Sequence, residues 1–169
     1  MNDRPRGALP HERLSWLERL ELIVPPPAVT LAVGVLMWLL ARWLPALHFV
    51  LPLRGVLASA LAVAGIALMG ACALQFRRAG TTVNPMKPQK VSALVDTGFY
   101  RFSRNPIYLA DLLILVGWGL WLSNVASLAA IALFVAYLNR FQIEPEERAL
   151  HEAFGAQFDA YRGRVRRWI

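Results

Sequence analysis

Four long apolar runs constrain the fold of this chain more than any other feature of its sequence. They cover residues 28–47, 53–76, 106–122 and 125–141, and each approaches the ~20 residues that an α-helix needs to cross a bilayer. Hydrophobic residues make up 57% of the chain and charged residues only 17%, whereas a soluble domain carries about a quarter charged residues. The sequence therefore predicts an all-α integral membrane protein with four transmembrane helices.

The positive charges indicate how these spans are oriented. All but two of the 18 Lys and Arg residues lie in the N-terminal tail, in the connection between the second and third spans, or at and beyond the end of the fourth. The exceptions are Arg42 and Arg54. Cytoplasmic segments carry the excess of Lys and Arg, so both termini are expected in the cytoplasm. The net charge of +7 then reflects topology, and we do not expect nucleic-acid binding.

The N-terminal segment, residues 1–27, has a pattern of its own ahead of the membrane domain, residues 28–169. Within HERLSWLERLELIV, apolar residues recur at helical spacing between charged ones, which indicates an amphipathic helix. This helix either lies in the membrane interface or packs on the cytoplasmic face of the protein. The prolines at 25–27 are expected to end it and to redirect the chain.

A polar connection, residues 77–105, separates the second and third spans and is too long for a simple turn. It runs into the third span through the stretch GFYRFSRNPIYLADLLILVG, residues 98–117, which places Arg, Asn and hydroxyl side chains at the mouth of the bundle. Asp111 follows one turn inside the span, where an acidic residue is costly. It is either a functional group or the partner of Arg101 or Arg104 in an ion pair.

A second polar stretch, the C-terminal segment 142–169, follows the fourth span. It opens with EPEER, and residues 146–161 have the periodicity of a helix. Because the third and fourth spans form a hairpin with a tight turn at Ser123-Asn124, both polar stretches are expected at the same rim. Adjacent carboxylates beside arginines can bind a ligand that carries both charge signs, or they can simply favour a helix N-terminus.

Several kinds of site are missing from the sequence. It contains no glycine-rich phosphate loop, no nucleophile elbow and no pair of histidines at metal-ligand spacing. The three histidines lie in separate segments, and the one cysteine, Cys72, excludes an internal disulfide. We therefore expect no metal site.

Two motifs together resemble a known superfamily. GFYRFSRNPIYLA, followed after the hairpin by EPEERALHEAFGAQFDAYRGRVRRWI, resembles the isoprenylcysteine carboxyl methyltransferases and phospholipid methyltransferases, which are integral membrane enzymes. The preceding FRRAGTTVNP is similar to the bacterial branch, so the resemblance covers residues 76–169. It implies a bacterial inner-membrane enzyme that uses S-adenosyl-L-methionine as methyl donor and needs no obligate protein partner.

The match to the family pattern Arg-His-Pro-x-Tyr-x-Gly is incomplete. Arg104, Pro106 and Tyr108 agree, whereas Asn105 stands in place of the histidine and Ala110 in place of the glycine. An asparagine amide can donate and accept hydrogen bonds but does not titrate near neutral pH. A role that requires an imidazole is therefore excluded at this position.

The resemblance implies a cofactor pocket between the hairpin and the C-terminal helix. Arg104 and Asn105 are expected to hold the methionine or adenosine end, Tyr108 to shape the methyl site, and Glu146 or Glu147 to bind the ribose or the ammonium group. Four of these residues form the expected catalytic set: Arg104, Asn105, Tyr108 and Glu147. The full expected cofactor-binding set is Gly98, Tyr100, Arg104, Asn105, Pro106, Tyr108, Leu109, Glu146 and Glu147. Alternatively, Arg104 only fixes topology and Tyr108 is an interfacial aromatic residue.

The expected acceptor is lipidic or a small amphipathic molecule, methylated on a carboxylate, thiol or amine, and it reaches the site sideways from the membrane lipid. Asp111, Tyr161, Arg162 and Arg164 are expected to contact it, with Arg162 or Arg164 orienting an anionic acceptor. Two other classes of function remain open. The C-terminal half is distantly similar to steroid-reductase-like proteins, which suggests an NADPH-dependent membrane reductase, and the chain could also be a non-enzymatic membrane scaffold or small transporter.

Overall fold

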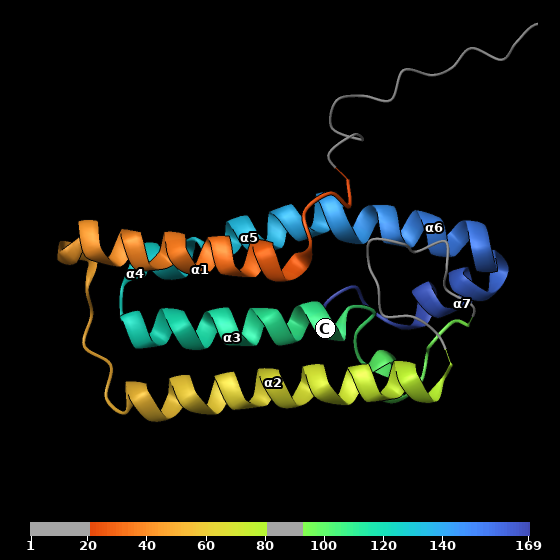
Figure 1. Cartoon of the computed structure of the whole chain (residues 1–169), viewed down its shortest axis with the longest axis horizontal. Helices are drawn as coiled ribbons and strands as arrows, with labels where there is room; N and C mark the ends of the chain where they lie inside the picture. Colours follow the sequence, from red (N-terminus) through yellow and green to blue (C-terminus); the bar gives the residue numbers. More distant parts are fainter. Residues whose placement is uncertain (1–20, 81–92) are drawn as a thin grey trace, which may run out of the picture.

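The computed structural model describes residues 21–80 and 93–169, and Figure 1 shows their arrangement. Across these two ranges the chain forms helices and turns with no β-strand, apart from an isolated bridge between His48 and Asn124. This confirms the predicted all-α class. The predicted N-terminal amphipathic helix falls largely outside the described residues.

Four apolar helical segments form the body of the protein. The first three are α1 (Pro26–Trp43), α2 (Arg54–Arg78) and α3 (Pro106–Leu122), and the fourth is a continuous helical run over Val125–Phe154. By length and composition α1, α2 and the fourth run could each cross a membrane, and α3 is a shorter apolar helix of 17 residues. The bounds of α3 coincide with the predicted third span.

The prolines before the first span begin a helix instead of only ending one. Pro26 and Pro27 occupy the first turn of α1, where a proline costs little because its missing N–H would have no partner in the helix. Helix α1 then ends at Trp43, earlier than predicted, because Pro45 opens the short 3₁₀ turn η2 (Pro45–Leu47). The predicted first span was therefore shifted toward the C-terminus by a few residues.

Helix α3 lies between α2 on one side and α1, α4 (Val125–Ala129) and α5 (Ile131–Leu138) on the other, as Figure 1 shows. Its most extensive packing is against α2. Glycine allows this close approach, since a Cβ on Gly65 of α2 would lie 2.7 Å from the carbonyl oxygen of Ala110. The outward side of α2 keeps large apolar side chains exposed, as expected for a helix that faces lipid.

The fourth run does not end where the apolar sequence ends. After α5 it passes through the π-turn η5 (Asn139–Ile143) into α6 (Glu144–Phe154). Thirty residues of helix extend for ~45 Å, well beyond the ~30 Å hydrocarbon core of a bilayer. We therefore place the charged helix α6 outside the membrane-spanning segment.

The single C-terminal helix predicted over 146–161 is wrong. Gly155 interrupts it with φ of +49°, a backbone conformation that favours glycine, and a separate helix α7 (Ala156–Arg164) follows. Figure 1 shows α7 folded back beneath α6, at the same end of the bundle as the C-terminal end of α2 and the start of α3. The polar segments predicted to share a rim are thus brought together.

Candidate functional site

A cavity of about 360 Å³ lies at this polar end of the bundle. Its walls come from the first turn of α1, the C-terminal half of α2, the segment before α3, the start of α3, and helices α6 and α7. The volume falls within the range typical of small-molecule sites, and most of the lining is apolar. Its charged and hydrogen-bonding lining residues are Tyr100, Arg104, Asn105, Tyr108, Asp111, Glu146, Glu147 and Tyr161.

Two carboxyl groups face the cavity from different helices. The Tyr108 hydroxyl, in the first turn of α3, donates a hydrogen bond of 2.5 Å to Oε1 of Glu146 on α6. Asp111 lies three residues after Tyr108, on the same face of α3, and its side chain is buried at 5% exposure. Within the described ranges Asp111 forms no ion pair, so the predicted alternative of a pair with Arg101 or Arg104 is wrong.

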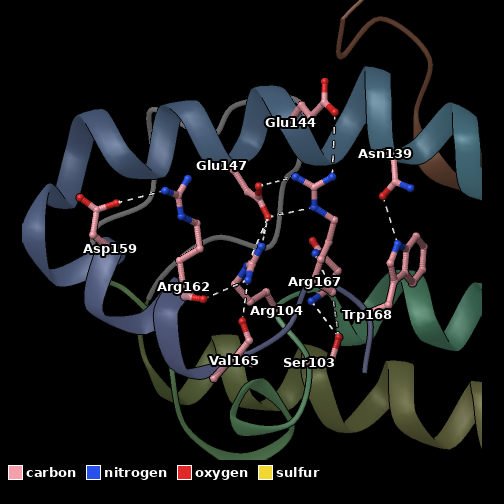
Figure 2. A network of polar contacts seen from close by, with 11 residues as sticks. Ser103, Arg104, Asn139, Glu144, Glu147, Asp159, Arg162, Val165, Arg167 and Trp168 are labelled. Carbon is pink, nitrogen blue, oxygen red and sulfur yellow. Dashed lines mark hydrogen bonds and ion pairs between the residues drawn. The ribbon is translucent and has the colours of Figure 1, made fainter.

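Arg104 is paired with Glu147 instead, in a network that Figure 2 shows. Its Nη2 lies 2.7 Å from Oε1 of Glu147, and Arg167 Nη2 lies 2.7 Å from Oε2 of the same carboxylate. The side chains of Arg104 and Glu147 are only 11% and 13% exposed, so the pair is largely removed from water. Glu147 therefore joins the start of α3 to the end of the chain.

Burial and charge act differently on the two neighbouring glutamates. Burial raises the pKa of Glu146, the charge of Glu147 adds to the rise, and the hydrogen bond from Tyr108 opposes it only in part. Burial alone would also raise the pKa of Glu147, but hydrogen bonds from Arg167 and Arg104 outweigh that effect and hold this pKa below its ordinary value. Glu147 is consequently a stable anion with two cationic partners, whereas Glu146 gains a proton more readily.

The C-terminal tail, Val165–Ile169, runs between the start of α3 and α6. The backbone N–H of Arg104 donates to the carbonyl of Arg166 at 2.9 Å, and its Nη1 donates to the carbonyl of Val165 at 2.5 Å. Nδ2 of Asn105 donates to the carbonyl of Arg167 at 3.0 Å. Asn105, which replaces the family histidine, thus holds main chain through its amide.

The structure brings most of the predicted cofactor-binding residues together. Six of the nine line the cavity, namely Tyr100, Arg104, Asn105, Tyr108, Glu146 and Glu147. Pro106 and Leu109 lie on α3 but are not part of the lining, and Gly98 borders a separate cavity beside Gln75.

The predicted acceptor-contacting residues divide into two groups. Asp111 and Tyr161 line the cavity, and the Tyr161 hydroxyl donates to the backbone carbonyl of Tyr100 at 2.8 Å. Arg162 and Arg164 are exposed and do not line it. They lie 3.9 Å from Asp159 and 3.7 Å from Asp96, because α7 presents them on its outer side.

Sequence reasoning missed the role of the residues at the very end of the chain. Arg167 was counted only as one of the C-terminal positive charges, and Trp168, which donates from Nε1 to Oδ1 of Asn139 at 3.0 Å, received no role. After α7 the chain is neither helical nor a strand, so no regular period indicates which side chains of the tail point inward. The pairing depends on tertiary contacts that lie far apart in the sequence.

Comparison with known proteins assigns the family. The model of the phospholipid methyltransferase family matches residues 53–157, which is more than half of the chain and includes α2, α3 and α6. An uncharacterized protein of Haemophilus influenzae is 41% identical over 63 residues, corresponding to 37% of this chain and the whole of that protein. No solved structure matches the chain. From the family match, the chain belongs to the phospholipid methyltransferase family.

Proposed function

We propose that this protein is an S-adenosyl-L-methionine-dependent methyltransferase that modifies a lipidic or small amphipathic acceptor at the cytoplasmic face of the membrane. Family membership implies methyl transfer to a lipid-type substrate. One observation carries the finer proposal: the carboxyl groups of Asp111 and Glu146 both line a mainly apolar cavity, and neither forms an ion pair within the described residues.

The charges of the cavity fit this cofactor better than they fit NADPH. S-adenosyl-L-methionine carries a sulfonium and an ammonium group, and a cation in an apolar cavity needs an opposite charge nearby. NADPH carries several phosphate charges, for which proteins use clustered arginines and lysines. Among the described lining residues Arg104 alone is basic, and its guanidinium already binds Glu147 and the tail.

Different residues of the cavity would attract the cofactor, position the carboxylates and exclude water. When bound, the cofactor supplies a methyl group that is activated by the positive sulfonium. Glu146 and Asp111 would attract the cationic groups, and Tyr108 holds the Glu146 carboxylate in place. Apolar side chains such as Ile107 and Phe158 exclude water. Alignment of donor and acceptor contributes much of the rate of a displacement of this kind, so fixed carboxylates are of direct value.

The acceptor would enter from the lipid phase. Met69 and Ala73 of α2 and the first turn of α1 form part of the cavity wall, so the cavity borders helices that face the bilayer. A molecule with an acyl chain can keep the chain beside these helices while its polar group reaches the carboxylates. This supports an amphipathic acceptor.

Calorimetry of the purified protein in detergent tests the cofactor. S-adenosylhomocysteine is expected to bind with micromolar affinity, and NADPH is expected not to bind. Glu146→Gln and Asp111→Asn should each weaken the binding, whereas Glu152→Gln, an exposed carboxylate on α6 outside the cavity, should leave it unchanged. Binding of NADPH would indicate a reductase, and binding of neither compound would leave a scaffold or transporter.

The acceptor requires a separate search. Methyl-tritiated S-adenosyl-L-methionine would be incubated with the protein and either total membrane lipid or mixtures of small thiols, amines and acids, and labelled products would be identified by mass spectrometry. A labelled product that disappears with Glu146→Gln and persists with Glu152→Gln would establish both the reaction and its site. No product above the level of a no-enzyme control would contradict the enzymatic proposal.

A further inference from the structure

We propose that the C-terminal tail, Val165–Ile169, is a latch that controls release of the ligand from the cavity, and that Arg167 is the positioning residue that keeps it closed. This inference rests on the proposed function, because it concerns the same cavity. It assigns a role to a segment beyond residues 53–157, the part matched by the family model.

The first observation is how completely the tail main chain is held. Three successive carbonyls, those of Val165, Arg166 and Arg167, each accept a hydrogen bond from Arg104 or Asn105. A fourth contact comes from the Ser103 hydroxyl, which donates to the Arg167 carbonyl at 3.3 Å. The tail is neither helical nor a strand, so these contacts, together with the Trp168–Asn139 hydrogen bond and the Arg167–Glu147 ion pair, keep it in one position.

The second observation concerns the hydrogen-bond partners of Arg104 and Asn105. Arg104 uses Nε and Nη2 on Glu147 and Nη1 on the tail, so its donors face protein groups. Asn105 likewise uses Nδ2 on the tail. The residues that the sequence assigned to a ligand therefore fasten the tail beside the cavity that they line.

The third observation is the connection from the tail to the cavity wall. Helix α7 immediately precedes the tail, and its Phe158 and Tyr161 are buried and line the cavity. In the described chain, α7 is joined to α6 through the turn at Gly155, to the start of α3 through the tail, and to the segment before α3 through the Tyr161–Tyr100 hydrogen bond. Release of the tail would therefore remove one of these three attachments and loosen the wall without unfolding the membrane helices.

Arg167 is the part of the latch that is easiest to release. Its side chain is 32% exposed, compared with 11% for Arg104. It also lies 3.9 Å from Glu144, so it connects the tail to α6 through two carboxylates. Substitution of Arg167 leaves the Arg104–Glu147 pair intact. The tail can therefore be loosened in a variant that keeps the fold.

The test compares Arg167→Gln with Arg101→Gln, which removes an exposed positive charge from the segment before α3. The dissociation rate of S-adenosylhomocysteine from the full-length protein in detergent is expected to rise at least ~10-fold in Arg167→Gln, about 1.4 kcal/mol. It should stay unchanged in Arg101→Gln, and Arg167→Lys should restore part of the slow release because a single positive charge remains.

A second readout follows the tail itself. The one native cysteine, Cys72, is fully buried, so Ile169→Cys provides a reactive thiol for a spin label at an exposed position. The label is expected to be more mobile in Arg167→Gln than in the Arg101→Gln background. An unchanged dissociation rate in Arg167→Gln, or tighter binding, would overturn the latch while the unmodified protein still bound S-adenosylhomocysteine. Absence of binding by the unmodified protein would overturn the proposed function as well.

Discussion

Glu146 and Glu147 are adjacent in the sequence, yet their carboxylates have different partners: Glu146 accepts from Tyr108 beside the cavity, and Glu147 accepts from two arginines. Consecutive residues on a helix point about 100° apart, so the split follows directly from the helical geometry of α6. The two adjacent glutamates therefore have different roles. Glu146 is available to a ligand, and Glu147 holds the protein together.

Separate alanine substitutions should divide these tasks. Glu147→Ala leaves Arg104 and Arg167 without their shared anion, so we expect a loss of about 2 kcal/mol in stability, less than the ~3–5 kcal/mol of a fully buried pair because Arg167 keeps access to water. Glu146→Ala leaves only the Tyr108 hydroxyl without its partner, so it should cost less stability than Glu147→Ala and mainly weaken binding of S-adenosylhomocysteine. Thermal unfolding and calorimetry in the same detergent measure the two effects. Equal losses of stability in both variants would contradict the division.

Tyr108→Phe removes the hydroxyl that fixes Glu146 and changes little else. A carboxylate that loses its donor in a partly dry site costs ~1–3 kcal/mol, so we expect affinity for S-adenosylhomocysteine to fall about tenfold. Tyr137→Phe is the matched control, because Tyr137 packs against Phe141 at a ring distance of 4.9 Å and lies outside the cavity. If both variants bind equally well, Tyr108 has no part in binding.

The raised pKa of Glu146 predicts opposite effects of pH on binding and on stability. The ammonium group of S-adenosylhomocysteine needs an ionised carboxylate beside it, so affinity should rise with pH as Glu146 loses its proton. Stability should change in the other direction. Folding raises the pKa of Glu146 above its ordinary value of 4.5, so the folded protein holds this proton more tightly than the unfolded chain does. The contribution of Glu146 to stability is therefore greatest below pH 4.5 and is lost as pH rises through the pKa of the folded state. In Glu146→Gln both trends should be reduced relative to the unmodified protein.

Titrations of S-adenosylhomocysteine and thermal scans between about pH 5 and about pH 9, each referred to Glu146→Gln at the same pH, isolate this residue from the other titrating groups. Glu152→Gln serves as the control, since Glu152 is exposed and should preserve both slopes. Affinity that falls as pH rises would show that Glu146 does not bind the ammonium group of S-adenosylhomocysteine.

The features that the sequence predicted depend on local signals. The start of α3 follows from a proline at a favoured first position, and its end follows from the apolar run stopping at Ser123, which adopts φ of +49° in a tight turn. The break at Gly155 has no such signal, because a lone glycine inside a helical pattern is usually tolerated. Its positive φ arises as the chain folds back and places α7 against the cavity.

Six of the nine predicted cofactor-binding residues line the cavity, but the sequence does not indicate which partners their side chains contact. Spacing identifies Arg104 and Glu147 as residues at one rim, but their partners are fixed only when the tail is in place. Arg167 lies 20 residues after Glu147, in a segment without regular secondary structure, where periodicity carries no information. The sequence places Asp111 one turn inside an apolar helix but leaves open whether it pairs with an arginine, and that choice depends on Arg104 being paired with Glu147.

The contact between α2 and α3 offers the sharpest test of the fold itself. A Cβ at Gly65 would lie 2.7 Å from the Ala110 carbonyl oxygen and 2.8 Å from Cγ1 of Ile114, and the first of these is backbone that cannot move aside cheaply. Gly65→Ala should therefore push the helices apart and cost ~1–3 kcal/mol. Because Ala110 directly precedes Asp111, the same shift should also weaken binding of S-adenosylhomocysteine.

Gly70→Ala is the matched control in the same helix, since a Cβ there meets no atom within 4 Å. Alanine is the better helix former, so Gly70→Ala should range from no change to a gain of about 1 kcal/mol. Thermal unfolding of both variants in one detergent compares them directly, and calorimetry reports the binding. Equal stability of the two variants would contradict the packing of α2 on α3, and with it the position of Asp111 at the cavity.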